Sequence, residues 1–431
     1  MKDFLSADNS LLFTQQMAKA DQAAIGRGIS GETLMGNAGQ AVVNAITERW
    51  EPQHAVVLCG PGNNGGDGFV IARLLGDLGW SVRLGLFGNL DQISTDARAH
   101  ADIWEGPIEQ ISADLIEGST LVVDSIFGAG LSRPVNGLVL DVLNCIGERA
   151  CVAVDIPSGV NGDTGEVRGF AKKADLTVTF FCKKPGHLLL PGRNLCGDLV
   201  VADIGIPEAV LSDLSISIAE NDPALWLSSM PNPNVEHHKY RRGYVVIAGS
   251  SEMPGAAILA ATSARRAGAG MVSLAVPKDA AAICKLAVQG GVVRVVRDTG
   301  MFEDIVADDR VGAVVVGPGL GVTVSARERV LAVLKHGRPL VLDADAITVF
   351  ENNRELLFSN ITGPCVITPH EGEFGKLFNS HGDKLSRALS AASESNAVLV
   401  LKGSDTVVAS PDGRAVINSN APPTLATAGA G

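Results

Sequence analysis

Three polar groups in the first half of this 431-residue sequence have the residue types and spacing needed to bind a small ligand and to move a proton. The glycine-rich stretch Gly60–Gly68 follows the apolar run His54–Cys59 and precedes a helical pattern. Asp124 ends a second apolar run, and Asp155 ends a third, three residues before Ser158. Because the carboxyl ends of parallel strands meet at one edge of a sheet, we expect these groups to form one cleft.

The glycine-rich stretch, Gly-Pro-Gly-Asn-Asn-Gly-Gly-Asp-Gly, satisfies G-x-G-x-x-G at Gly60, Gly62 and Gly65, but it differs from a dinucleotide fingerprint. The next strand, Ser81–Phe87, does not end in the acidic residue that would hold a ribose. Asp67 lies in the predicted loop itself, where its carboxylate would repel a pyrophosphate. Glycines allow a ligand to approach the backbone closely, so we interpret the stretch as a binding loop rather than a structural turn.

The second half repeats this arrangement with different residues. Polar segments follow four predicted strands: Gly317–Gly321, Leu342–Ala346, Thr368–Glu373 and Leu401–Thr406. The last of them combines a lysine with N–H and hydroxyl donors, which suit nucleotide phosphates.

Metal binding in this half is less clearly indicated. Asp343 and Asp345 are compatible with a water-bound magnesium ion or with helix capping, and both interpretations stay open. His370 is followed by Glu371 and Glu373, but the segment lacks the helical histidine pair typical of zinc sites. We therefore interpret His370 as a substrate contact.

The elements that must position these residues alternate between short apolar runs and helical patterns, which is typical of α/β domains with mostly parallel sheets. In the front half, helices are predicted at Met17–Arg27, Glu32–Trp50 and Gly66–Leu78. The halves share no motifs, so we predict a fusion of two domains, 1–215 and 235–431, joined by a linker over 216–234. The predicted strands begin with His54–Cys59 in the first domain and include Tyr244–Ala248, Met271–Val276 and Ala313–Val316 in the second.

Composition limits the classes of function. Apolar residues make up 46% of the chain and charged residues 19%, which argues against disorder, and the net charge of −12 argues against nucleic-acid binding. Seven scattered cysteines without a C-x-x-C pair indicate a reducing compartment. With no signal peptide or membrane-spanning run, we expect a soluble, cytoplasmic protein without a membrane partner, and we expect a homo-oligomer.

The front motifs Asn63–Gly68, Asp124–Pro134 and Val154–Asn161 together resemble the epimerase domain of the two-domain NAD(P)H-hydrate epimerase–dehydratase family. The resemblance implies a Rossmann-like, doubly wound domain that interconverts the R and S forms of the hydrated cofactor NAD(P)HX. It also implies contacts between this hydrate and the following residues: Asn63, Asn64, Gly65, Gly66, Asp67, Gly128, Ala129, Gly130, Leu131, Ser132, Arg133, Pro134 and Asp155.

The same resemblance implies that Asn64, Asp124 and Ser158 bind a potassium ion; oxygen donors with a single carboxylate suit such a cation better than zinc. Asp155 would be catalytic and move a proton as the C6 hydroxyl centre opens and recloses, with acid and base not separately assigned. Lys184 also matches the family pattern, but we predict a solvated surface lysine.

The back half resembles the ribokinase-like dehydratase of the same family, which uses ADP or ATP, with Mg²⁺, to return (S)-NAD(P)HX to NAD(P)H by phosphoryl transfer and elimination. This resemblance assigns the hydrate to Ala256, Gly319 and His370, and the nucleotide to Lys402, Gly403, Ser404, Asp405, Thr406 and Gly431. The family's Gly-Thr-Gly-Asp loop corresponds to Gly429-Ala-Gly431, and the sequence ends before its aspartate. We therefore expect a natural C-terminal segment beyond Gly431, and with it full dehydratase activity.

Two other functions fit parts of the sequence. A ribokinase-like fold could phosphorylate a small alcohol, although the front domain with its Asn-Asn-Gly-Gly-Asp-Gly motif argues against this. The front fold could also be a non-catalytic nucleotide-binding scaffold. The presence of Asn64, Asp67, Asp124 and Asp155 disfavours that second alternative.

Overall fold

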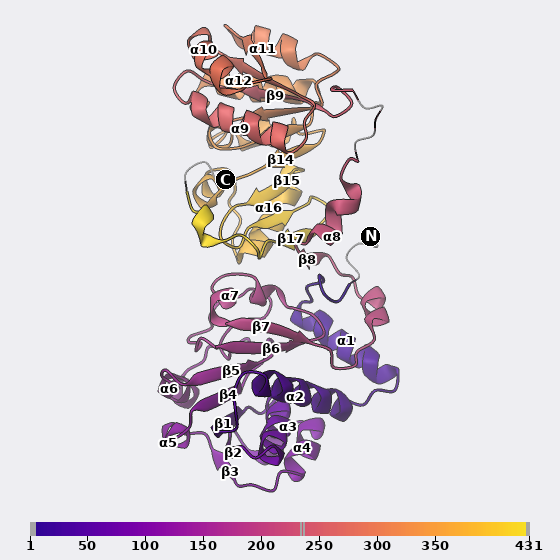
Figure 1. Ribbon diagram of the computed structural model, residues 1–431, viewed down its shortest axis with the longest axis vertical. Helices are drawn as coiled ribbons and strands as arrows, with labels where there is room; N and C mark the ends of the chain where they lie inside the picture. The colour runs from indigo at the N-terminus through magenta and orange to yellow at the C-terminus, as the bar shows by residue number, and fades with distance from the viewer. Residues whose placement is uncertain (1–5, 233–234, 236–237, 428–431) are drawn as a thin grey trace. The chain divides into compact units, whose positions relative to one another are not determined.

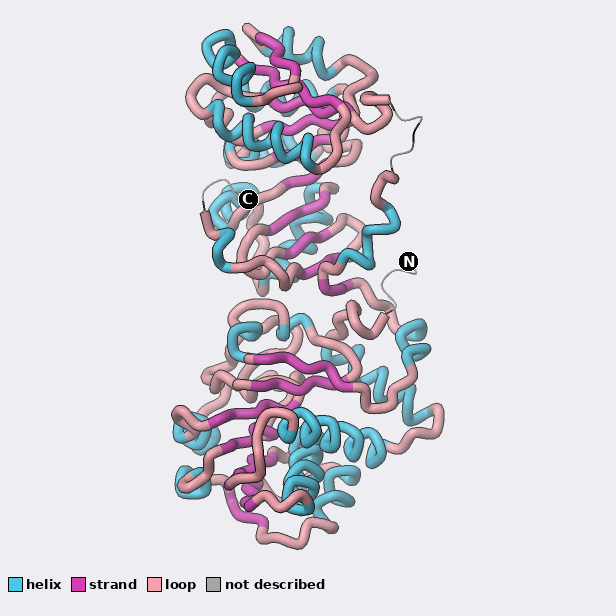
Figure 2. The backbone as a smooth tube through the Cα atoms, viewed as in Figure 1, coloured by secondary structure: helices cyan, strands magenta, loops and turns pink. Residues whose placement is uncertain are grey.

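The computed structural model describes residues 6–232, 235 and 238–427, and the chain forms two compact units, Met1–Leu225 and Trp226–Gly431 (Figures 1 and 2). Each unit has its own sheet and is described by itself. Among the described residues, no helix is both long and apolar enough to cross a membrane.

The first unit is built on a parallel sheet with the strand order β3-β2-β1-β4-β5-β6-β7. Its strands are β1 (His54–Cys59), β2 (Ser81–Leu86), β3 (Ile108–Gln110), β4 (Leu121–Ser125), β5 (Ala150–Val154), β6 (Leu176–Phe180) and β7 (Asp198–Ala202). The order reverses between β1 and β4, and such a switch point leaves a crevice beyond the carboxyl ends of these strands.

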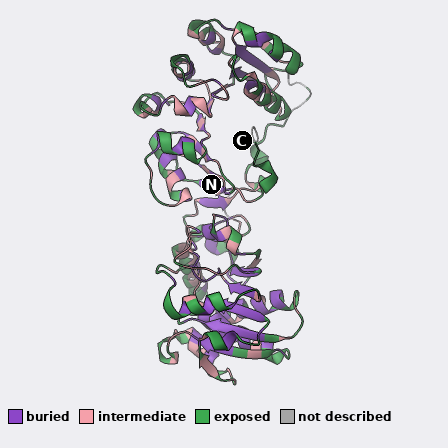
Figure 3. Ribbon diagram, turned by 90° about the vertical axis from the view of Figure 1, so that its left-hand side faces the viewer, coloured by how far each residue is buried: buried purple, intermediate pink, exposed green. Residues whose placement is uncertain are grey.

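Helices cover both faces of this sheet because successive strand residues point to opposite sides. Val57 and Cys59 of β1 join one core with α1 (Thr14–Gly26), α2 (Gly31–Thr47), α3 (Asn63–Asp77) and α4 (Thr95–Asp102). Val56 and Leu58 join the opposite core with α5 (Ala113–Ile116) and α6 (Gly137–Cys145). The central strands β1, β4, β5 and β6 are accordingly buried on both sides (Figure 3). The shorter elements are η2 (Leu90–Gln92), η3 (Pro185–His187), α7 (Gly192–Leu195), η4 (Glu208–Asp213) and β8 (Ile218–Glu220).

The second unit contains a mostly parallel sheet in which β11-β10-β9-β12-β13-β14-β15 are followed by antiparallel β16 and β17. The strands are β9 (Tyr244–Ala248), β10 (Met271–Val276), β11 (Val292–Val295), β12 (Ala313–Val316), β13 (Leu340–Leu342), β14 (Cys365–Ile367), β15 (Val398–Leu401), β16 (Val407–Ala409) and β17 (Ala415–Ile417). The main helices are α9 (Pro254–Arg266), α10 (Lys278–Ala287), α11 (Thr299–Val306), α12 (Val324–Lys335), α13 (Asp345–Thr348), α14 (Arg354–Phe358), α15 (Glu371–Leu377) and α16 (Lys384–Ser395).

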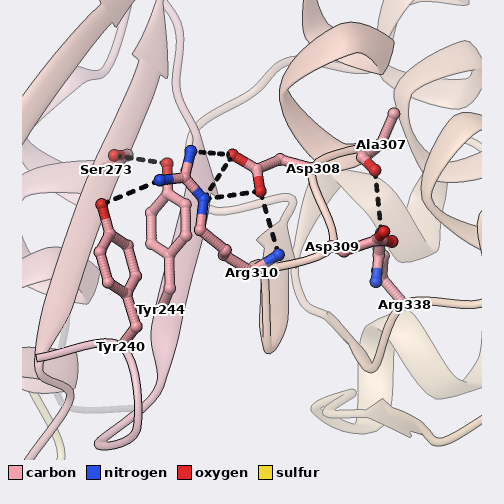
Figure 4. A network of polar contacts seen from close by, with 8 residues as sticks. All are labelled: Tyr240, Tyr244, Ser273, Ala307, Asp308, Asp309, Arg310 and Arg338. Atoms are coloured by element: carbon pink, nitrogen blue, oxygen red, sulfur yellow. Dashed lines mark hydrogen bonds and ion pairs between the residues drawn. The ribbon is translucent and has the colours of Figure 1, made fainter. Parts of the chain in front are cut away.

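Both tyrosines of the chain lie where β9 begins, in a network that holds the preceding segment (Figure 4). Tyr244 donates its hydroxyl to Ser273 Oγ at 2.9 Å, while Arg310 donates to the Tyr240 hydroxyl at 3.3 Å. Arg310 also forms an ion pair with Asp308 at 2.6 Å. These contacts tie the turn before β9 to the loop before β12.

The predicted α/β class is confirmed, and β1, β9, β10 and β12 have the predicted bounds. One local prediction is wrong. The helix expected to begin at Gly66 begins at Asn63, so Asp67 lies in α3 rather than in a loop. Gly62 is the extended residue before the helix. The glycines that follow it are helical, and because they have no side chain they allow α3 to pack closely on its neighbours.

Candidate functional site

A pocket of about 620 Å³ lies in the first unit at the switch point of the sheet, a volume in the usual range for small-molecule sites. It is bordered by the N-terminus of α3, the loop after β4 and the residue after β5. Ten residues predicted from the sequence line it: Asn63, Asn64, Asp67, Gly128, Ala129, Gly130, Leu131, Ser132, Arg133 and Asp155.

Gly65 and Gly66, predicted as contacts, are buried in α3 and do not line the pocket. A Cβ atom on Gly65 would come 1.8 Å from the carbonyl oxygen of Gly60, and one on Gly66 would come 2.5 Å from Met35 Sδ. These two glycines therefore allow α3 to pack against the loop after β1 and against α2. Pro134 also lies outside the pocket lining.

Asp155 is the best-anchored acid of the pocket. It follows β5 in the left-handed region, with a φ of 66°, which is uncommon for a residue other than glycine. Its Oδ2 accepts the Ala129 N–H at 2.9 Å, and its Oδ1 accepts the Thr179 hydroxyl at 2.9 Å. The left-handed backbone and three side-chain hydrogen bonds, the third from Lys184, fix this carboxylate at the pocket wall.

Lys184 donates the third hydrogen bond, at 2.7 Å to Asp155 Oδ1, and forms an ion pair with this carboxylate. Its side chain is 2% exposed, so the prediction of a solvated surface lysine is wrong. Phe181, after β6, has a φ of 61° and belongs to the turn between that strand and Lys184. The neighbouring Lys183 forms an ion pair with Glu220 instead, so one of two adjacent lysines is at the site and the other is not.

The charges of this cluster are arranged to keep Asp155 ionised. Burial is the largest single effect and opposes ionisation. The Lys184 ammonium, the neighbouring His187 and the hydrogen bonds from Lys184 and the Ala129 N–H together outweigh it and hold the pKa of Asp155 well below its usual range. Burial, together with the Lys184 charge, lowers the pKa of His187 to about 4, so this imidazole is neutral at pH 7. Its Nδ1 accepts the Lys184 N–H at 2.9 Å, and its Nε2–H donates to the Asp155 carbonyl at 2.8 Å.

Two other carboxyl groups of the pocket have the opposite tendency. Burial raises the pKa of Asp67 well above its usual value, and the negative charges of Asp155 and Asp21 raise it further. Burial also raises the pKa of Asp21, on α1, to about 6. The pocket therefore combines the ionised Asp155 carboxylate with two carboxyl groups, of Asp21 and Asp67, that retain protons more readily than an exposed aspartate. Asp21 was not identified from the sequence, where it belongs to an ordinary amphipathic helix.

Asp124 and Ser158 lie directly behind the pocket wall. The buried Asp124 accepts hydrogen bonds from the Ser158 hydroxyl at 2.6 Å and from the Ser158 N–H at 2.9 Å. Burial raises the pKa of Asp124. Among the described residues, Asp124 forms no ion pair with a lysine or arginine. The side-chain oxygen and nitrogen of Asn64 are buried and have no hydrogen-bond partner among the described residues. A buried carboxylate and an unpartnered amide oxygen fit an oxygen-bound cation.

In the second unit, the structure brings Ala256 and Gly319 together. A Cβ atom on Gly319 would come 3.1 Å from Ala256 Cβ and 2.7 Å from Met253 Cβ, so only glycine fits its left-handed position, with a φ of 63°. The Ser250 hydroxyl donates to the Gly319 carbonyl, which ties the loop after β9 to the loop after β12.

His370 caps helix α15, where its Nδ1 accepts the backbone N–H groups of Gly372 at 2.9 Å and Glu373 at 3.3 Å. Its side chain is 59% exposed, and Nε2 lies 3.4 Å from Glu373 Oε1. A structural role as a cap and a contact through the exposed edge of the ring are therefore both compatible with its geometry.

The segment predicted to bind nucleotide is held from two sides. Lys402 forms an ion pair with Asp343 at 2.8 Å, and Asp405 forms one with Lys384 at 2.6 Å. The Thr406 hydroxyl donates to the Gly403 carbonyl at 2.7 Å, which closes the turn. Ser404 belongs to the same turn. Gly431, predicted to contact the nucleotide, lies outside the described residues.

The two aspartates after β13 have different surroundings. Asp343 Oδ1 accepts both Lys402 Nζ and the Thr368 hydroxyl, each at 2.8 Å. Asp345 Oδ2 accepts the Gly321 N–H at 2.8 Å and so supports the glycine loop after β12. Both aspartates thus have protein partners, and among the described residues no cluster of three or more histidine, cysteine or acidic side chains has the arrangement of a metal site.

The fold and pocket define the class of protein: a two-unit α/β enzyme whose first unit holds an ionised carboxylate–lysine pair at the switch point of a doubly wound sheet. Two known protein families match this chain, one in each of its two units. Residues 31–186 match the family described as YjeF-related protein N-terminus, and residues 244–431 match the family described as NAD(P)H-hydrate dehydratase.

Full-length relatives identify the family. The bifunctional NAD(P)H-hydrate repair enzyme Nnr of Thermofilum pendens is 36% identical over 95% of this chain and 83% of its own length, and that of Moorella thermoacetica is 36% identical over 92% and 81%. The crystal structure of the ADP/ATP-dependent NAD(P)H-hydrate dehydratase of Bacillus subtilis, co-crystallised with ATP/Mg²⁺, is 29% identical, with a TM-score of 0.40 over 46% of this chain and 72% of that chain. The chain belongs to the family of bifunctional NAD(P)H-hydrate repair enzymes, which confirms the predicted family and enzyme class.

Proposed function

We propose that the first unit interconverts (R)- and (S)-NAD(P)HX, with Asp155 as its proton-transferring carboxylate. The observation that carries this proposal is the buried ion pair between Asp155 and Lys184, 2.7 Å long, at the wall of a 620 Å³ pocket. A carboxylate that stays ionised although it is buried can accept a proton from a bound substrate. A purely structural ion pair would not need to be buried at the wall of a pocket, as that of Asp155 and Lys184 is.

The reaction requires both removal and delivery of protons. In NAD(P)HX the C6 carbon carries a hydroxyl group and is bonded to the ring nitrogen, so its configuration changes when this centre opens and recloses. Asp155 accepts a proton, and Lys184 keeps it ionised and correctly oriented. Asp67, whose pKa burial raises, lines the same pocket and can form a hydrogen bond with the nucleotide. The residues Asn63, Asn64 and 128–133 provide the rest of the contact surface.

Asn64, Asp124 and Ser158 would hold a potassium ion behind the pocket wall. When bound, the ion would supply a fixed positive charge, which opposes the rise in the pKa of Asp124 that burial causes. Asn64 would gain a partner for its buried amide oxygen. The Ser158 hydroxyl oxygen accepts the Phe127 N–H at 2.9 Å and so keeps the loop after β4 in place.

The second unit is proposed to dehydrate (S)-NAD(P)HX with ADP or ATP as phosphoryl donor and Mg²⁺ as counter-ion of the phosphates. The juxtaposed Ala256 and Gly319, together with the exposed edge of His370, would hold the hydrate. Residues 402–406 would hold the nucleotide through the lysine and the N–H groups of a closed turn. The domains of this proposal are 1–215 and 235–431, with 216–234 between them.

A mixture of (R)- and (S)-NADHX, incubated with the chain and analysed by chromatography, tests both activities. We expect the unequal mixture to approach a single R/S ratio without nucleotide, faster with potassium chloride than with an equal concentration of choline chloride. Recovery of NADH after addition of ADP or ATP with Mg²⁺ would support the dehydratase. A stable phosphate ester would instead indicate a small-alcohol kinase acting on this substrate. A folded sample that changes neither epimer would contradict the repair function and favour a binding scaffold.

A further inference from the structure

Helix α1 contributes one wall of the epimerase pocket, although it precedes residues 31–186, the segment that matches the family profile. Met17, Asp21 and Ile25 line the pocket at intervals of four residues, and therefore lie on one face of the helix. Asp21 is the only acidic residue of this face and is flanked on both sides by apolar side chains.

The position of Asp21 is fixed by the rest of the helix. Ala20 and Ala24 are fully buried in the core on the sheet side of α1. At the beginning of the helix, the Thr14 N–H donates to Asp163 at 2.7 Å, and just after its end Arg27 forms an ion pair with Asp213 at 2.7 Å. Because both ends of α1 and the face beside Asp21 are anchored, Asp21 is held towards the pocket.

Asp21 is close enough to the reactive cluster to interact with it electrostatically. The negative charge of Asp155 raises the pKa of Asp21 and the positive charge of Lys184 lowers it, while Asp21 in turn raises the pKa of Asp67. Asp96 and Arg133 are the other charged residues of the lining. On η4, which packs against α1, Asp213 is paired with Arg27, and Glu208 accepts the Ala7 N–H.

We propose that Asp21 is a second catalytic residue of the epimerase site and delivers the proton to the C6 oxygen, while Asp155 accepts a proton on the opposite face of the ring. This assignment rests on the proposed epimerase function. It gives the site the acid and base that inversion at C6 requires, from two different walls of one pocket.

The proposed step is balanced in atoms and electrons. Asp21 protonates the C6 hydroxyl oxygen, the C6–O bond breaks with its electron pair leaving on water, and the ring nitrogen lone pair forms a C6=N double bond. Water then attacks the other face of C6, the pair of the C6=N bond returns to nitrogen, and Asp155 takes one proton from this water. One water leaves and one enters, and the proton returns from Asp155 to Asp21 through solvent.

The protonation states favour Asp21 over Asp67 as the acid. A general acid works best when its pKa lies near the working pH, because it must both release and regain its proton. Burial raises the pKa of Asp21 to about 6. Burial also raises the pKa of Asp67, which is more deeply buried than Asp21 and therefore exchanges its proton with solvent less easily. Asp155, which its ion pair with Lys184 helps to keep ionised, is the base of the pair.

Two measurements test the assignment. First, the wild-type kcat/KM for epimerisation should fall as pH rises through about 6, because kcat/KM follows the titration of the free enzyme. Second, Asp21→Asn should lower kcat about 100-fold with little change in KM, and should abolish this alkaline fall. Asp21→Glu should restore part of the rate. Asp77→Asn, the same chemical change at the exposed end of α3, should leave both rate and pH profile unchanged.

The outcomes separate this assignment from the function on which it rests. A wild-type chain that does not interconvert the epimers overturns the proposed function. A wild-type chain that is active, but whose kcat/KM shows no fall above about pH 6, overturns the role of Asp21 alone, even if Asp21→Asn cannot be purified folded. A folded Asp21→Asn variant with wild-type kcat overturns it as well.

Discussion

Asp155 has a strained backbone conformation and forms a buried ion pair with Lys184. A residue other than glycine in the left-handed region costs of the order of 1 kcal/mol, and Asp155 has a φ of 66°. The surrounding contacts hold it there: its backbone N–H donates to Val178 at 2.8 Å, its carbonyl accepts from His187, and its carboxylate accepts from Lys184. Strain that is retained at a buried ionised group is typical of a functional site.

We expect Lys184→Met to abolish epimerisation and to lower the free energy of unfolding by about 3–5 kcal/mol at pH 7, because it leaves Asp155 buried without its cation. The pH dependence should reverse. With Lys184 present, the lowered pKa of Asp155 gives stability above its unfolded pKa, which is lost as pH falls. Without Lys184, burial raises that pKa, so stability should increase as pH falls towards 4.

Denaturant unfolding between about pH 4 and pH 8 would measure this difference. Lys173→Met provides the control, since Lys173 is exposed and the same substitution there removes a charge without uncovering a buried partner. Equal stability of the Lys184→Met variant and the control at pH 7 would contradict the account of the buried ion pair.

Helix α3 shows how glycines determine where an element can lie. Gly65 and Gly66 allow α3 to approach the loop after β1 and α2, as described above, and this approach brings Asn64 and Asp67 to the pocket. Gly76, near the other end of the same helix, faces open space, with no atom within 4 Å of an added Cβ. The two kinds of glycine therefore predict opposite effects of the same substitution.

Gly65→Ala should destabilise the first unit by about 1–3 kcal/mol or more, because its Cβ would overlap the Gly60 carbonyl oxygen. Gly76→Ala should stabilise it by about 0.5–1 kcal/mol, since alanine loses less conformational freedom in a helix than glycine. Thermal unfolding of the two variants would check both signs. A stable, active Gly65→Ala protein would show that α3 does not need this close approach.

The sequence predicted the site correctly where polar residues directly follow apolar strands, because the sheet then determines where these residues lie. Apolar strands followed by Asn64, Asp67 and Asp155 predicted one cleft, and these residues line one pocket. It failed for Lys184, because the direction of this side chain depends on the turn after β6 and on a carboxylate 29 residues away. It also missed Asp21, because a helical pattern indicates a buried face but not which polar residue meets a pocket made by distant strands.

The whole chain has two units, each with its own sheet and hydrophobic core. Cysteines buried in these cores are shielded from reagents in solution. Six of the seven cysteines are buried, and only Cys145 is exposed. Burial raises the pKa of the Cys182, Cys196 and Cys365 thiols to about 12, so their thiolate forms are scarce at neutral pH.

One thiol should therefore react rapidly with a thiol reagent in the folded chain, and all seven in denaturant. The Cys145→Ser variant should show no rapid reaction while folded. Rapid labelling of a second thiol in the native chain would mean that one of the two cores opens readily.

The most direct test of the central claim is the rate at which pure (R)-NADHX becomes an R/S mixture without added nucleotide, compared between wild type and Asp155→Asn. This substitution keeps the size of the side chain, but the resulting amide cannot accept the proton, so we expect a rate about 10²–10⁴-fold lower at unchanged folding. Equal rates in two folded proteins would contradict the assignment of Asp155 as the catalytic base and, with it, our account of the first unit.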